Sequence, residues 1–261
     1  MRLIWGTGLV VVITVAAFWF FMSGTEGPVE KSEAPANLSM ETVRLKTKDG
    51  VEIVADYYLP LGEKQIINGA SRGVLLIHMM PSDRKSWVKF AEKLQAASFP
   101  ALAIDLRGHG ESRGGPDGYK SFSDEEHQGS TFDVLAGAVF LRSKKVDEFH
   151  LVGASIGANL ALQYLSEHPN ARSAVLLSPG LDYRGLKTPE FMKKVPQTRG
   201  IFLVASEDDV YSKDTANELA SRVTLDEKHQ AKIFETGGHG TALFENHPEF
   251  MDEVIAWLKS F

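Results

Sequence analysis

Residues 149–165, FHLVGASIGANLALQYL, place a Gly-x-Ser-x-Gly motif between an apolar run and a helical pattern. The run at 149–155 is typical of a buried strand, and 156–168 are expected to form the next helix. On such a sharp strand-to-helix turn the Ser155 hydroxyl is exposed, and Gly153 and Gly157 relieve the crowding that the turn creates. The helix amino terminus also favours developing negative charge. A serine that only caps a helix is the alternative, but the flanking elements favour a nucleophile.

Apolar runs and helical patterns alternate on both sides of this motif. Two runs, 41–47 and 51–60, flank Asp49-Gly50, a pair typical of a hairpin turn. Six further strands are expected at 73–80, 100–108, 149–155, 173–180, 200–208 and 231–238. Helices are expected at 87–97, 132–141, 156–168, 214–223 and 249–258. The alternation predicts the α/β class, with a mostly parallel sheet of eight strands and helices on both faces.

A serine nucleophile needs a base, and the base needs a carboxylate that orients it. His239 follows the last expected strand in the glycine-rich turn Gly237-Gly238-His239-Gly240, so we expect it to be the base. The strand at 200–208 leads into Glu207, Asp208 and Asp209, which gives the chain order serine, acid, histidine. Asp208 is the first choice for the acid, Asp209 the second and Glu207 the third.

The developing oxyanion needs two backbone donors. The N–H of Ile156, directly after the nucleophile, is one candidate. The N–H of Met80, in the turn after the strand at 73–80, is the other. The side chains of Met79 and Met80 are expected to form only apolar wall.

Several of these segments together resemble the α/β-hydrolase superfamily over residues 41–261. They are LIHMMPSDRKSW (76–87), DLRGHGES (105–112), GASIGANLAL (153–162), LLSPG (176–180), VASEDD (204–209) and GGHGT (237–241). The chain is most similar to the lid-poor esterase, dienelactone-hydrolase and monoglyceride-lipase-like branches.

The resemblance implies roles for some residues. Its small-x-x-Asp pattern fits 205–208 and favours Asp208 as the acid. Asp105, Arg107 and His109 resemble a structural turn of that family. Many members carry His-Gly where this chain has His78-Met79, so a side chain replaces glycine beside the oxyanion turn and predicts a narrower acyl pocket.

The segment at 181–199, where many relatives carry a large lid, is short, so we expect a minimal lid and an open site. Tyr183, Phe191 and Met192 in this segment either line the site or anchor the loop.

Residues 3–22 are uncharged and mostly apolar, and about 20 helical residues span a bilayer core of about 30 Å. The stretch ends in bulky residues, which favours an uncleaved membrane anchor over a cleaved signal peptide. Arg2 precedes it, so the positive-inside rule predicts that the rest of the chain lies outside the cytoplasm, whether anchored or released after cleavage. Residues 23–40 read as a flexible tether, and 41–261 as the catalytic domain.

The net charge of −6 argues against nucleic-acid binding. The absence of cysteine excludes disulfides, thiolate metal sites and cysteine nucleophiles. No metal or nucleotide motif occurs, so we expect no cofactor. The leading hypothesis is hydrolysis of small carboxylic esters through an acyl-enzyme. A thioesterase, an amidase or an acyltransferase would use the same site, and a non-catalytic membrane-anchored binding protein is the alternative of another class.

Overall fold

The computed structural model describes residues 39–67 and 69–261. The membrane segment expected at 3–22 and the tether up to residue 38 lie outside the described residues, so the anchor stays a prediction. Among the helices of the described part, none has both the length and the apolar character needed to cross a bilayer.

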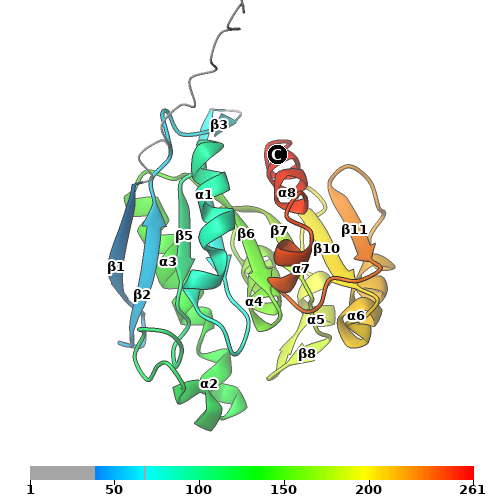
Figure 1. Cartoon of the computed structure of the whole chain (residues 1–261), viewed down its shortest axis with the longest axis horizontal. Coiled ribbons are helices and arrows are strands. Elements are labelled where there is room, and N and C mark those ends of the chain that lie inside the picture. The colour runs from blue at the N-terminus through cyan, green and yellow to red at the C-terminus, as the bar shows by residue number, and fades with distance from the viewer. Residues whose placement is uncertain (1–38, 68) are drawn as a thin grey trace, which may run out of the picture. The chain divides into compact units, whose positions relative to one another are not determined.

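The core of the fold is a mostly parallel sheet with strand order β1-β2-β5-β4-β6-β7-β10-β11, as expected from the sequence (Figure 1). The strands β1 and β2 form the expected antiparallel hairpin, β2 pairs antiparallel with β5, and the remaining neighbours in this order are parallel. Their bounds are β1 Met40–Lys46, β2 Glu52–Tyr58, β4 Ala70–Ile77, β5 Ala101–Ile104, β6 Glu148–Ala154, β7 Ala171–Leu177, β10 Gly200–Ser206 and β11 His229–Phe234. A two-residue strand, β3 (Ile66–Ile67), pairs with β4.

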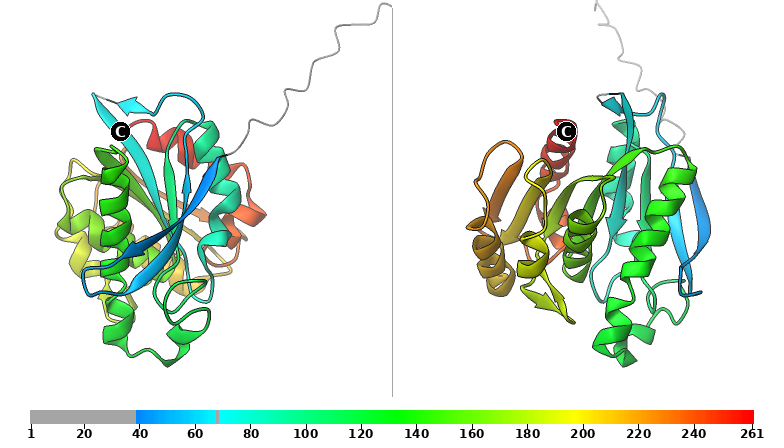
Figure 2. Two further views of the ribbon diagram at one scale, coloured as in Figure 1. Left: turned by 90° about the vertical axis from the view of Figure 1, so that its left-hand side faces the viewer. Right: turned by 180° about the vertical axis from the view of Figure 1, so that it is seen from behind.

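Helices cover both faces of the sheet (Figure 2). One face carries η1 (Arg84–Trp87), α1 (Val88–Ala96), α7 (Ala242–Asn246) and α8 (Phe250–Leu258). The other carries α3 (Thr131–Ser143), α4 (Ile156–Glu167) and α6 (Val210–Ala220). The short η2 (Gly118–Ser121), α2 (Asp124–Gln128) and α5 (Thr188–Met192) lie in the connections. Each face has its own buried apolar cluster.

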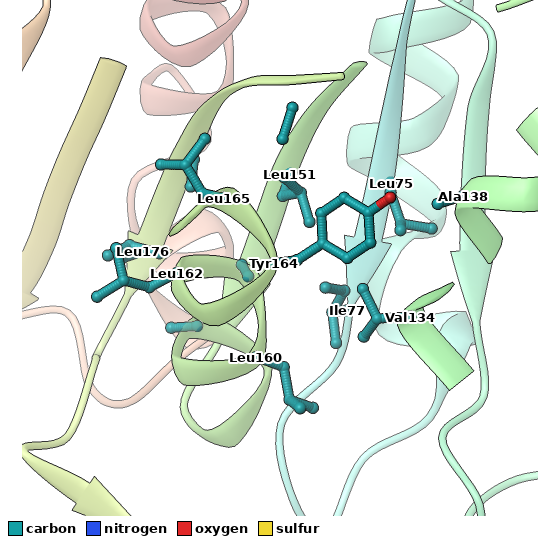
Figure 3. Close-up of a cluster of buried hydrophobic side chains, with 14 of the residues drawn as sticks. Leu75, Ile77, Val134, Ala138, Leu151, Leu160, Leu162, Tyr164, Leu165 and Leu176 are labelled. Carbon is teal, nitrogen blue, oxygen red and sulfur yellow. The ribbon is translucent and has the colours of Figure 1, made fainter. Parts of the chain in front are cut away.

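The cluster beneath α4 fixes the frame of the strand-to-helix turn (Figure 3). Leu75 of β4 and Leu151 of β6 pack with Leu160 and Leu165 of α4, and all four are 0–1 % exposed. Each such leucine contributes about 1.5–3 kcal/mol when it is fully buried. The turn between β6 and α4 is therefore held by well-packed elements on both sides.

Two local differences from the expected elements concern the site. Helix α6 begins at Val210 rather than at 214, because Val210 and Tyr211 are exposed and break the apolar periodicity at its start. The segment 181–199 contains a small hairpin, β8 (Asp182–Tyr183) and β9 (Leu186–Lys187), before α5. Two-residue strands leave too little pattern to be found in the sequence.

Candidate active site

Ser155 occupies a strained turn directly between β6 and α4. Its backbone has φ 54° and ψ −121°, a conformation that side chains other than glycine rarely adopt. A Cβ on Gly153 would collide with the carbonyl of Gly157, and one on Gly157 would collide with the carbonyl of Ile77. The two glycines are therefore required by close backbone approach, as the motif predicts. The Ser155 side chain is placed at the carboxyl edge of the sheet and the residue is 7 % exposed.

His239 lies in the turn after β11, where Gly238 (φ 69°) and Gly240 (φ 62°) adopt left-handed conformations. Its Nδ1 lies 2.7 Å from Oδ2 of Asp209. The Asp209 side chain is only 14 % exposed and that of His239 is 39 % exposed. The Nδ1–H donates this short hydrogen bond to a mostly buried carboxylate, which keeps the proton on Nδ1. Nε2 is then free to accept a proton.

The acid that the structure pairs with His239 is Asp209, which corrects the expectation that Asp208 would do so. The carboxylate of Asp208 instead accepts hydrogen bonds from the N–H groups of Gly238 (3.1 Å) and Gly237 (3.3 Å). A hydrogen bond from Ser206 and these backbone bonds hold the pKa of Asp208 below its usual value. Asp208 thus supports the turn that carries His239.

The physical reason lies in where two elements begin and end. Strand β10 ends at Ser206, and Asp209 is the residue directly before α6. That position aims the Asp209 carboxylate at the turn after β11. Glu207, the third choice for the acid, pairs with Lys213 (3.1 Å) at the surface.

The two expected oxyanion donors come from the start of α4 and from the loop after β4. The N–H of Ile156 is the first of α4, and the first N–H groups of a helix have no partner within the helix. Met80 lies in the loop after β4, and the close approach of Gly157 to the carbonyls of Ile77 and His78 brings the elbow against this strand end. Both candidates therefore come from elements that meet beside Ser155.

His78 fixes the turn that carries Met80, a role that the sequence did not reveal. Its Nε2 accepts a bond from the Leu106 N–H (2.9 Å), so its Nδ1 carries the proton and donates to the Met79 carbonyl (2.8 Å). Burial, with a smaller contribution from the nearby His109, lowers the pKa of His78 to about 3, so the ring is neutral at ordinary pH. The one available signal was a histidine at the end of a continuous apolar strand.

Arg84 secures the same loop from its other end. Its N–H donates to Oδ1 of Asp105 (2.7 Å), and its guanidinium pairs with Asp105 and Asp56. Arg107 pairs in turn with Asp133 (2.8 Å). These contacts agree with the structural role that the sequence assigned to Asp105 and Arg107. His109 stacks on Tyr119 and adds to this turn.

Met79 packs toward the histidine turn. A Cβ on Gly240 would collide with the Met79 sulfur, so this side chain lies against the residue after His239. The N–H of Gly240 donates to the Ser178 hydroxyl (2.9 Å). The turn that carries His239 is thereby held from both sides.

The three residues left open in the segment 181–199 divide between the two roles. Phe191 and Met192 are 9 % and 6 % exposed and pack into the core beside α4, so they anchor the segment. The Tyr183 ring covers Gly180, and its hydroxyl lies near the hydroxyls of Ser155 and Ser212. Tyr183 therefore borders the nucleophile.

Among residues 39–67 and 69–261, no group of three or more histidine, aspartate or glutamate side chains is placed to hold a metal ion. The carboxyl edge of the sheet carries a serine in a strained turn and a histidine bonded to a carboxylate. These are the parts that acyl transfer requires.

Comparison with known proteins agrees with this fold. Residues 73–227 match the family model described as the alpha/beta hydrolase fold. Among solved structures, the Pyrococcus furiosus esterase Pf2001 aligns with a TM-score of 0.67 and 19 % identity, covering 85 % of this chain and 91 % of that one. Dienelactone hydrolase from Anabaena variabilis aligns with a TM-score of 0.66 and 17 % identity, covering 86 % and 97 %.

One similar curated protein is the non-heme chloroperoxidase CPO-A1 of Kitasatospora aureofaciens, 30 % identical over 150 residues, 55 % of this chain and 47 % of that protein. Another is the probable lysophospholipase BODYGUARD 4 of Arabidopsis thaliana, 30 % identical over 111 residues, 42 % and 25 % of the two chains. The alignments thus span half or less of each of these curated relatives. The family model, in contrast, matches more than half of this chain. With its sheet order and its strand-to-helix turn, the chain belongs to the α/β-hydrolase fold family.

Proposed function

We propose that this protein hydrolyses carboxylic esters with Ser155 as nucleophile, His239 as general base and Asp209 as the orienting acid. The observation that carries the proposal is the 2.7 Å bond between Asp209 and His239 at the sheet edge where Ser155 occupies its strained turn. The three residues follow β6, β10 and β11, whose carboxyl ends share that edge.

The proposed reaction uses the tautomer of His239 that its bond to Asp209 favours. The Ser155 oxygen bonds to the acyl carbon, and its proton passes to Nε2 of His239. Asp209 accepts the Nδ1–H bond and stabilises the imidazolium that forms. The N–H groups of Ile156 and Met80 bind the oxyanion. When the bond to the leaving group breaks, His239 gives it the proton, and water then releases the acyl group by the same steps in reverse.

The named relatives support the ester assignment by their chemistry. The esterase and the dienelactone hydrolase share this fold, and the probable lysophospholipase shares part of the sequence. A probable alcohol acetyltransferase of Cyberlindnera fabianii is 27 % identical over 119 residues, 45 % of this chain and 29 % of that protein. Transfer of the acyl group to an alcohol instead of water is therefore the second candidate.

The deciding experiment compares the full-length wild type with Ser155→Ala. We expect the wild type to hydrolyse p-nitrophenyl acetate and to be labelled by a fluorophosphonate, and Ser155→Ala to lose at least 10³-fold in kcat and all labelling. Ser166→Ala is the matched control, because this serine lies on the same helix α4 and its hydroxyl bonds the Gln163 carbonyl. Equal labelling of wild type and Ser155→Ala would refute the proposal. Acyl transfer is tested by adding ethanol, because a competing transfer would form ethyl acetate in place of some of the acetate.

A further inference from the structure

The hairpin β8–β9 places Tyr183 on one particular side of the nucleophile. In the sheet, β4 lies on one side of β6, and β7, β10 and β11 lie on the other. Of the two expected oxyanion donors, Met80 follows β4 and Ile156 begins α4 directly after Ser155, whereas Asp209 and His239 follow β10 and β11. Tyr183 belongs to β8, which follows β7 and lies, like β10 and β11, on the β7 side of β6 (Figure 1).

The Tyr183 ring is held in place rather than free to move. It lies so close over Gly180 that a Cβ there would be 2.6 Å from the ring. The Tyr211 ring meets it edge-on at 5.7 Å between centroids. The hairpin is closed by a bond from the Gly185 N–H to the Asp182 carboxylate (2.7 Å). A glycine, an aromatic neighbour and a tied turn thus fix the direction of the Tyr183 hydroxyl.

The hydroxyl of Tyr183 lies near the hydroxyls of Ser212 and Ser155. It lies 3.4 Å from the Ser212 hydroxyl, and its contacts with the Ser212 and Ser155 hydroxyls both favour the ionised phenol. Burial outweighs these contacts and raises the pKa of Tyr183, and the charge of Asp209 raises it further. The hydroxyl therefore keeps its proton at neutral pH and is a hydrogen-bond donor.

We propose that the Tyr183 hydroxyl donates a hydrogen bond to the alkoxy oxygen of the scissile ester bond and to the water that later takes its place. This proposal rests on the ester hydrolysis proposed above. If Met80, which follows β4, binds the carbonyl oxygen, that oxygen lies toward β4, and the leaving-group oxygen then lies toward β7 and β10, the side from which Tyr183 and His239 come.

The bond changes remain those of acyl transfer. The bond from the acyl carbon to the alkoxy oxygen breaks, both its electrons stay on that oxygen, and the proton from Nε2 of His239 makes it an alcohol. Tyr183 gives no proton away, and its hydrogen bond stabilises the negative charge that develops before protonation is complete. In the second half of the reaction the same bond holds the attacking water toward His239.

The test is Tyr183→Phe, which keeps the ring over Gly180 and removes only the hydroxyl. A donor to the leaving oxygen matters most when the leaving group is poor, because more charge must then be stabilised. We expect kcat/KM to fall about 10- to 100-fold for ethyl acetate and less than about threefold for p-nitrophenyl acetate, as for the loss of one bond to a charged group. With p-nitrophenyl acetate, kcat for the release of the acyl group should fall about 10-fold.

Tyr211→Phe is the matched control, because its hydroxyl contacts the backbone of Asp182 instead of the nucleophile. It should stay within twofold of wild type on both esters. The proposal for Tyr183 would be overturned if kcat/KM of Tyr183→Phe fell equally on both esters or did not fall at all. Turnover by the wild type would in that case still support the ester hydrolysis. Should Tyr183→Phe fold poorly, 3-fluorotyrosine at this position keeps the ring and gives a stronger donor, which should raise kcat/KM for ethyl acetate and leave p-nitrophenyl acetate unchanged. No change on ethyl acetate would again overturn it.

Discussion

Replacing Asp209 with asparagine should nearly abolish turnover. The carboxylate accepts the Nδ1–H of His239 at 2.7 Å. An asparagine amide of the same size turns its NH₂ toward Nδ1, so that Nδ1 must accept and the proton moves to Nε2. The histidine is then in the wrong tautomer to take the Ser155 proton, and nothing offsets the imidazolium charge.

The size of the expected loss in kcat follows from the burial of the Asp209–His239 pair. Asp209 is 14 % exposed, so water cannot replace it as the partner of Nδ1. The matched change in a sheltered Asp–His pair of another serine hydrolase fold lowers kcat about 10⁴-fold. That factor corresponds to about 5.4 kcal/mol of lost transition-state stabilisation.

Asp208→Asn provides the contrast, since the two carboxylates are adjacent in the chain. Its remaining carbonyl oxygen can still accept from Gly238, so the turn before His239 keeps one of its supports. The cost is the difference between a charged and a neutral acceptor, about 1 kcal/mol, or about fivefold in kcat/KM.

The assay is the steady-state hydrolysis of p-nitrophenyl acetate by both variants and wild type, with fluorophosphonate labelling rates as a second readout. Circular dichroism and thermal melting establish that each variant is folded. Loss of activity in Asp208→Asn, with Asp209→Asn within 10-fold of wild type, would refute the assignment of Asp209 and restore Asp208.

Three further changes test the framework of the site. Gly157→Ala puts a methyl group against the carbonyls of Ile77 and His78. We therefore expect a loss of about 3 kcal/mol or more in unfolding free energy, together with the loss of turnover. A stable, active variant would contradict the elbow geometry. His78→Gln breaks the bonds to Met79 and Leu106. This change should lower the unfolding free energy measured with denaturant by about 2–4 kcal/mol, and it should lower kcat more than it raises KM. An unchanged kcat would show that the oxyanion turn does not need these bonds. Burial lowers the pKa of His150 from 6.5 to about 3, so below pH 6.5 only the unfolded chain takes up this proton and stability falls as pH falls. In His150→Gln the slope of unfolding free energy against pH between about pH 6 and 4 should shrink by about 1.4 kcal/mol per unit, and an unchanged slope would mean that His150 is not buried neutral.

Local chemistry in the sequence was enough for the elbow and for the class of fold. A nucleophile turn needs glycine at 153 and 157 because no other residue fits the backbone approach there, and strands buried on both faces need continuous apolar runs. Those requirements concern residues that are adjacent in the chain. The sequence therefore predicts Ser155 with its flanking strand and helix, and it predicts the sheet of eight strands. The position of His239 after the last strand followed from the same alternation.

Only the tertiary structure decided which acid faces His239 and what approaches Ser155 from the hairpin. Asp208 and Asp209 have the same chemistry and adjacent positions, and the choice between them depends on α6 beginning at Val210. That start is hidden in the sequence because Val210 and Tyr211 are exposed and break the helical pattern. Tyr183 comes from a hairpin of two-residue strands. It contacts Ser155 although 28 residues of chain separate the two. Over that separation no local sequence pattern determines where the Tyr183 side chain points, because its direction depends on tertiary packing.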